Sequence, residues 1–166
     1  MLRQMYRQCD FKRLMELYET NYFLLSHLIP DLRQTQADMA ALIPNKLILF
    51  SQVLETSKYT KTLYLTHYYH DLQQTEYTPG LILRAFFDSQ QAEVLSWTNP
   101  ESFAHINKAR FSCLSDINNK WQVNYFLAKW LQYCLQEGYL LEYHLGWVKP
   151  QPSQDVMLDY HDKAAS

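Results

Sequence analysis

Three charged side chains in the middle of the chain form the most coherent candidate for chemistry. Arg84, Asp88 and Glu93 lie in and between two apolar runs, 81–87 and 92–97, which alternate as the strands of a hairpin do. In that register Arg84 lies diagonal to Glu93, and Asp88 stands at the turn. Phe86 and Trp97 are the apolar neighbours of Arg84, and they lower the local dielectric around its guanidinium. A lower dielectric strengthens the attraction of the guanidinium for a carboxylate or a phosphate. The simpler interpretation is an ordinary cross-strand ion pair with a turn-initiating aspartate.

Aromatic and lysine side chains are mixed along the preceding strand. Tyr64 and Tyr68 lie in the run 59–69, close to Lys58 and Lys61. Aromatic rings among lysines on a sheet can stack the bases of a single-stranded nucleic acid. Against this, 15 basic and 17 acidic residues leave a formal charge of −2, and tyrosine is favoured in any strand. We therefore expect no nucleic-acid partner, and keep Tyr64 and Tyr68 as candidates for binding another ligand.

The densest polar cluster is His67, His70 and Asp71. In a strand His67 and His70 point to opposite faces, so they cannot hold one metal ion without further ligands from elsewhere in the chain. The sequence has no nucleophile motif of the G-x-S-x-G type. We therefore expect no metal site, no cofactor and no catalytic residues, and we favour a binding protein over an enzyme.

Composition restricts the class of protein further. The chain has 166 residues, about the length of one domain, and its 48% hydrophobic content is typical of a globular protein. Only three glycines occur, which argues against a glycine-rich phosphate loop. The three cysteines are odd in number and widely spaced, which argues against a disulfide framework. No signal peptide or membrane span is evident, so we expect a cytoplasmic protein.

Two long helices are predicted on either side of the middle third. Apolar residues recur at three- and four-residue steps over 10–29, with Asp10 as the N-cap and Pro30 as the stop. A second and wider apolar face predicts a helix over 116–137, and Gly138 suits the left-handed position after its end. Residues 31–44 are polar and predict a linker between the first helix and the strands.

A period of two in the middle of the chain predicts antiparallel strands. The runs 46–53 and 59–69 form one hairpin and the runs 81–87 and 92–97 a second, with Pro79-Gly80 as a turn before it. Helix, strands and helix in this order predict an α+β fold with a sheet of four to five strands.

The predicted first hairpin also sets the two sheet faces. With a two-residue turn at 56–57, one face carries Leu47, Leu49, Val53 and Tyr64. If both helices pack on the other face, this apolar surface stays open, and an open apolar patch usually marks a binding site.

The remaining predictions concern the last quarter of the chain. A short strand is predicted around Phe111 and Leu114, and a final strand over 139–147. The chain becomes polar and acidic from Pro150, so we expect one domain over 1–149 and a flexible tail over 150–166.

Three pieces of the sequence share a pattern with a known family. Residues 19–25 read E-x-N-Y-x-x-L, residues 88–94 contain an aspartate followed by A-E-V, and residues 124–135 read N-x-F-L-x-x-W-L-x-x-C-L. With these pieces, most of residues 10–140 resembles the YqiB-like family of uncharacterised proteins from gamma-proteobacteria. The resemblance implies a cytoplasmic bacterial protein of this fold, and no catalytic residues are established for the family.

These observations favour a non-enzymatic binding or regulatory module that acts through an apolar and aromatic sheet face. Its partner would be another protein or a second copy of the chain, with no membrane involved. The alternative is a small-molecule binder or small enzyme that uses Arg84, Asp88 and Glu93. A second alternative is weak binding of single-stranded nucleic acid.

Overall fold

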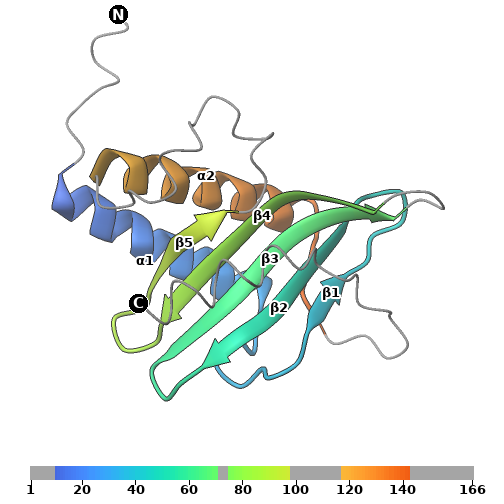
Figure 1. The fold of residues 1–166 in the computed structure, drawn as a ribbon, viewed down its shortest axis with the longest axis horizontal. Coiled ribbons are helices and arrows are strands. Elements are labelled where there is room, and N and C mark those ends of the chain that lie inside the picture. Colours follow the sequence, from blue (N-terminus) through green and yellow to red (C-terminus); the bar gives the residue numbers. More distant parts are fainter. Residues whose placement is uncertain (1–9, 71–74, 98–116, 143–166) are drawn as a thin grey trace, which may run out of the picture.

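The computed structural model describes residues 10–70, 75–97 and 117–142, and these form the predicted α+β architecture. One antiparallel sheet has the strand order β1-β2-β3-β4-β5, and both helices pack side by side on the same face of it (Figure 1). We call the face under the helices the inner face and the opposite one the outer face. The elements are α1 (Phe11–Leu28), β1 (Met39–Ala41), β2 (Ile48–Thr56), β3 (Thr60–His70), β4 (Thr75–Phe86), β5 (Gln91–Trp97) and α2 (Ile117–Gln136).

Helix α1 begins and ends where the sequence predicts. The Asp10 side chain accepts a hydrogen bond from the Arg13 backbone N–H at 2.8 Å, which satisfies one of the free donors of the first turn. Ile29 is the C-cap and Pro30 follows it. Phe11, which lies on the predicted apolar stripe, is 68% exposed because the buried side of the helix starts at Leu14.

Helix α2 ends in a Schellman motif. Gly138 has a φ of +86°, its N–H donates to the Leu135 carbonyl, and the Tyr139 N–H donates to the Cys134 carbonyl. This geometry confirms the predicted role of Gly138. The chain then returns to the sheet, where Glu142 forms an antiparallel bridge with Ala40 of β1.

The β2–β3 pairing differs from the predicted one in both its loop and its register. Thr56 pairs with Lys61, so the loop has four residues, 57–60, and not the predicted two. This change moves the register by an even number of residues, so by itself it leaves each side chain on its predicted face. A β-bulge between Val53 and Glu55 adds one more residue to β2. That single residue exchanges the two faces of the rest of β2, because side chains alternate with a period of two.

The predicted assignment of side chains to the open sheet face is therefore wrong. Leu49 is fully buried and packs, together with Val53, in the core under the helices. Tyr64 lies instead with Phe50 on the outer face. Leu47 precedes β2 and is 44% exposed. The prediction that both helices would cover the same face is nevertheless confirmed.

Two further features of the sheet differ from the prediction. Pro79 and Gly80 lie within β4, where Gly80 pairs with Thr66 next to a register shift in the ladder, and they do not form a turn. Proline and glycine inside a strand are typical of such an irregularity. The predicted linker 31–44 contains the three-residue strand β1, which is too short to show a period in the sequence.

A buried amide network joins the two helices to the edge strand β5. The Asn124 Oδ1 accepts from the Val94 backbone N–H at 3.0 Å and from the Asn21 Nδ2 at 3.3 Å. Its Nδ2 donates to the Lys120 carbonyl at 2.8 Å. Asn21 and Asn124 are both 0% exposed, although helical periodicity gives no reason to place asparagines in a core.

Some predicted features lie outside the described residues: the strand around Phe111 and Leu114, the part of the 139–147 strand after Glu142, and the tail 150–166.

Candidate functional site

The outer face has its own apolar cluster at its centre. Phe50 of β2, Tyr64 of β3 and Ile82 of β4 pack together and are 0%, 3% and 2% exposed. Partly buried apolar side chains surround them: Ile48, Leu54 and Leu95. The cluster is separate from the core between the inner face and the helices.

Polar side chains are interleaved with this cluster. Gln52 pairs with Tyr64, and Thr66 pairs with Phe50, so both lie on the outer face. Gln52 is 8% exposed, and its Oε1 is buried without a hydrogen-bond partner in the described part of the chain. A buried acceptor without a donor is costly, so this oxygen favours an occupant that brings an N–H or O–H group.

Arg84 lies on the outer face beside the cluster. Its Nε donates to the Thr62 Oγ1 at 3.1 Å, and its Nη2 lies 3.4 Å from the Glu55 Oε2. These two contacts hold the guanidinium at the edge of the apolar cluster. The ion pair with Glu55 was missed in the sequence because the four-residue loop, longer than predicted, brings that residue opposite Thr62.

The three predicted charged candidates do not form one group of contacts. Arg84 pairs directly with Glu93 in the β4–β5 ladder, whereas the sequence predicted a diagonal relation. Asp88 is exposed in the turn after β4. Tyr68 belongs to β3 and pairs with Ile48, but its side chain lies outside the described residues.

Lys61 points away from the tyrosines of the outer face. It is 1% exposed, and its ammonium donates to the backbone carbonyls of Leu32, Arg33 and Thr35, at 2.6 Å and 3.0 Å for the first two. Burial lowers the pKa of this lysine. All three N–H bonds of Lys61 are therefore used to hold the segment after α1, and the geometry gives no support to a lysine and tyrosine surface for nucleic acid.

His67 belongs to a buried aromatic cluster under α2 that the sequence did not predict. The Trp130 Nε1 donates to the His67 Nδ1 at 2.9 Å, and the Cys134 Sγ lies 3.9 Å from the His67 Nε2. The Tyr139 ring packs 5.1 Å from the imidazole, centroid to centroid. A cysteine next to a histidine is the arrangement of many nucleophilic enzymes.

The tautomer of His67 argues against that chemistry. An indole N–H can only donate, so the Nδ1 of His67 must accept, and its proton must lie on Nε2 facing Cys134. The imidazole then has no lone pair left to take the thiol proton. Burial also raises the pKa of Cys134 to about 12, and the thiol is 0% exposed. The pair therefore acts as packing and hydrogen bonding within the core.

The same burial predicts a pH dependence of stability. Burial lowers the pKa of His67 from its ordinary 6.5 to about 4. The unfolded chain therefore takes up this proton first, and the free energy of unfolding should fall by up to about 3 kcal/mol as the pH drops from 6.5 toward 4. Urea titrations at a series of pH values measure this slope.

The matched pair of variants for this prediction is His67→Gln and His27→Gln. His27 is exposed on α1, so its replacement is the control for the loss of an imidazole outside the core. Replacement of His67 should flatten the slope between pH 6.5 and 4. An unchanged slope in His67→Gln would mean that another group causes the acid sensitivity.

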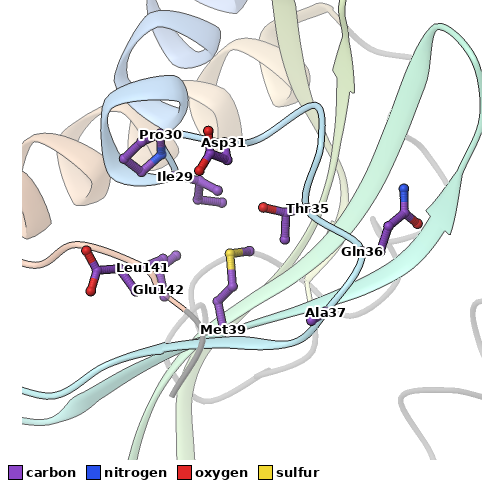
Figure 2. Close-up of a pocket in the computed structure, with 9 residues that line it drawn as sticks. All are labelled: Ile29, Pro30, Asp31, Thr35, Gln36, Ala37, Met39, Leu141 and Glu142. Atoms are coloured by element: carbon purple, nitrogen blue, oxygen red, sulfur yellow. The ribbon is translucent and has the colours of Figure 1, made fainter. Parts of the chain in front are cut away.

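A cavity of about 470 Å³ lies between the end of α1, β1 and the returning chain (Figure 2). Met39 reaches into it, and Asp31 and Glu142 are among the residues that line it. None of the five predicted candidates lines it. Since Asp31, Gln36 and Glu142 are exposed, the cavity offers a ligand few desolvated polar contacts, and the outer face is the better candidate.

Metal binding and membrane crossing each require a recognisable arrangement of residues. No group of three or more histidine, cysteine or acidic side chains within residues 10–70, 75–97 and 117–142 is arranged to hold a metal ion. In the same part of the chain, neither helix is both long and apolar enough to cross a membrane.

Comparison with known proteins identifies relatives but no activity. The chain is 28% identical over 133 residues to the uncharacterised protein YqiB of Escherichia coli K12, a match that covers 78% of this chain and 91% of that protein. The YqiB proteins of E. coli O6:H1 and O157:H7 match equally well. No solved structure matches. The sequence profile of the family described as "Protein of unknown function (DUF1249)" matches residues 24–140, and the chain therefore belongs to the DUF1249 family.

Proposed function

We propose that the protein is a non-enzymatic binding module whose outer sheet face holds an apolar segment of a protein partner. The observation that carries the proposal is the apolar cluster of Phe50, Tyr64 and Ile82 on a sheet face that neither α1 nor α2 covers. Apolar surface on a sheet is stabilised by burial against a second layer. A partner segment would supply that layer.

The polar groups of the outer face support a peptide as the occupant. The unpaired Oε1 of Gln52 needs a donor, and a backbone N–H of an extended peptide is one. Arg84 can anchor a carboxylate at the edge of the cluster. The described face also carries Glu55 and Glu93 close to Arg84, so it has no excess of positive charge to attract a polyanion.

The two edges of the sheet are less suited to binding than its face. At β1, Ala40 exchanges both backbone hydrogen bonds with Glu142. At β5, the Val94 N–H donates to Asn124. Since these positions are already used, addition of a partner strand is not the mode that we propose.

A cytoplasmic location is part of the proposal. It is supported by Cys134, which is a free thiol packed against His67. Free buried thiols are ordinary core residues in a reducing compartment.

Site-specific photo-crosslinking in cells tests the function. A photoreactive phenylalanine analogue at Leu95, on the outer face, should capture a distinct protein, and one at Phe23, which is 61% exposed on α1, should not. Leu95→Lys should reduce co-purification of that protein at least about tenfold, because a lysine ammonium resists transfer into an apolar contact. The matched control Phe23→Lys should retain it.

Two outcomes would change the assignment. Equal retention of the partner by Leu95→Lys and Phe23→Lys would exclude the outer face as its binding site. Sedimentation as a dimer that Leu95→Lys dissociates would identify the partner as a second copy of the chain.

A further inference from the structure

Arg84 turns away from its direct neighbour on the outer face. Glu93 of β5 pairs with Arg84 of β4, which places their Cβ atoms roughly 5 Å apart. The guanidinium nevertheless reaches toward β3 and β2, where its Nε donates to the Thr62 Oγ1 and its Nη2 lies 3.4 Å from the Glu55 Oε2. Within the described residues, the Glu93 carboxylate is therefore left without an ion pair.

The charges at this end of the outer face do not balance. The strand ladders place Glu55, Arg84 and Glu93 in one row across β2, β4 and β5. Two carboxylates and one guanidinium leave this row with an excess of one negative charge. The neighbouring turns do not change the excess, because Lys58 between β2 and β3 and Asp88 after β4 carry opposite charges.

Glu93 lies next to the apolar cluster. It is half-buried, and two side chains beside it, Leu95 on the same strand and Ile82 on β4, belong to the cluster. A segment that packs on these apolar side chains also removes water from the Glu93 carboxylate. A carboxylate that loses water without gaining a counter-charge is costly, so a segment that binds well must bring a cation to it.

We propose that the segment held by the outer face carries a lysine or arginine that pairs with Glu93, beside the apolar residue that packs on the cluster. This inference rests on the proposed function, and it adds the chemistry that selects the partner: an apolar segment with a basic flank. A partner carboxylate at Arg84 would have to compete with Glu55, whereas a cation at Glu93 meets no competing cation in the described part of the chain.

Glu93 selects mainly by rejecting other segments. An acidic flank would meet the like charge of Glu93, and a neutral flank would leave the carboxylate without water and without a partner. The apolar cluster alone accepts any apolar residue of suitable size. The discrimination between apolar segments is therefore assigned to Glu93.

Selection from a library of random linear peptides tests the inference. The full-length protein is the immobilised target, and the peptides kept are those that bind it and fail to bind Leu95→Lys, since these use the outer face. We expect the kept peptides to share an apolar residue with a lysine or arginine close to it. The tightest of them is then synthesised, and its affinity is measured by fluorescence anisotropy.

Reversal of the charge separates an ion pair from general attraction. Glu93→Lys should weaken the basic peptide at least about tenfold, and replacing the basic residue of the peptide with glutamate should restore binding to this variant. Glu93→Gln, which keeps the shape of the side chain, should weaken the peptide by about threefold. The matched control is Glu19→Lys, which makes the same change of net charge at an exposed position of α1 and should leave the affinity unchanged.

The outcomes that contradict the two proposals differ. Peptides that depend on Leu95 but show no preference for lysine or arginine would overturn this inference and leave the outer face as the binding surface. The same conclusion would follow if Glu93→Lys and Glu93→Gln left the affinity of a basic peptide unchanged. A library without any peptide that depends on Leu95 would overturn the proposed function, and this inference with it.

Discussion

Replacing Lys61 with methionine should lower the free energy of unfolding by about 3 kcal/mol, because three backbone carbonyls lose their donor at once. The ammonium binds the carbonyls of Leu32, Arg33 and Thr35, and no water can replace it fully where the site is buried. Relief of the desolvation that lowers the lysine pKa offsets part of the loss. Urea denaturation followed by tryptophan fluorescence measures the difference.

Lys58→Met is the matched control for this prediction. Lys58 lies in the same hairpin and is exposed, and its Nζ lies 4.9 Å from the centroid of the Tyr59 ring. Its replacement should cost less than about 1 kcal/mol. Equal effects of the two substitutions would show that the ammonium of Lys61 does not hold the segment after α1 to the sheet.

The helices show how much a sequence can predict when the signals are local. Asp10, Pro30 and Gly138 act within a turn of the positions that they define, and the structure confirms each role. The β4–β5 hairpin was predicted for the same reason, and its side chains lie on the predicted faces, although Arg84 pairs directly with Glu93 and not diagonally.

The β2–β3 register shows where local signals stop. No residue type near Leu54 marks it as the extra residue of a bulge, yet that bulge decides which side of β2 faces the helices. The predicted open surface therefore contained Leu49 and Val53, which are in the core. The prediction that both helices pack on one face depended on the order of elements and is confirmed, and the other face carries a second apolar cluster.

The buried polar groups were missed for a different reason. Lys61 binds a segment about thirty residues earlier in the chain, and His67 binds Trp130 and Cys134 from α2. Periodicity describes which side of an element is apolar, but it says nothing of partners on another element. Such networks are visible only once the topology is known.

The division between the two faces also explains why we favour binding over catalysis. Among the described residues, the groups with shifted pKa values lie on the inner side: Lys61, His67, Cys134 and Tyr139. Each is enclosed by hydrogen bonds or by the core. The outer side has the unpaired Gln52 oxygen, the fixed Arg84 and the second apolar cluster. The groups able to do acid–base chemistry are thus separated from the surface able to hold a ligand.

Replacing Asn124 with alanine should destabilise the protein by about 3 kcal/mol, because the buried Val94 N–H and the Asn21 amide lose their common acceptor. The Val94 amide should also exchange its hydrogen much faster, which NMR detects at that one residue. Gln122→Ala, exposed on the same helix, is the control and should change neither quantity.

A double-mutant cycle with Asn21→Ala separates the shared bond from packing. Since Asn21 donates to both the Oδ1 and the backbone carbonyl of Asn124, the double variant should lose less stability than the two single losses combined. Strict additivity would show that the two amides act independently. Coupling would instead mean that the α1–α2 contact and the hydrogen bond to Val94 of β5 form one structural unit.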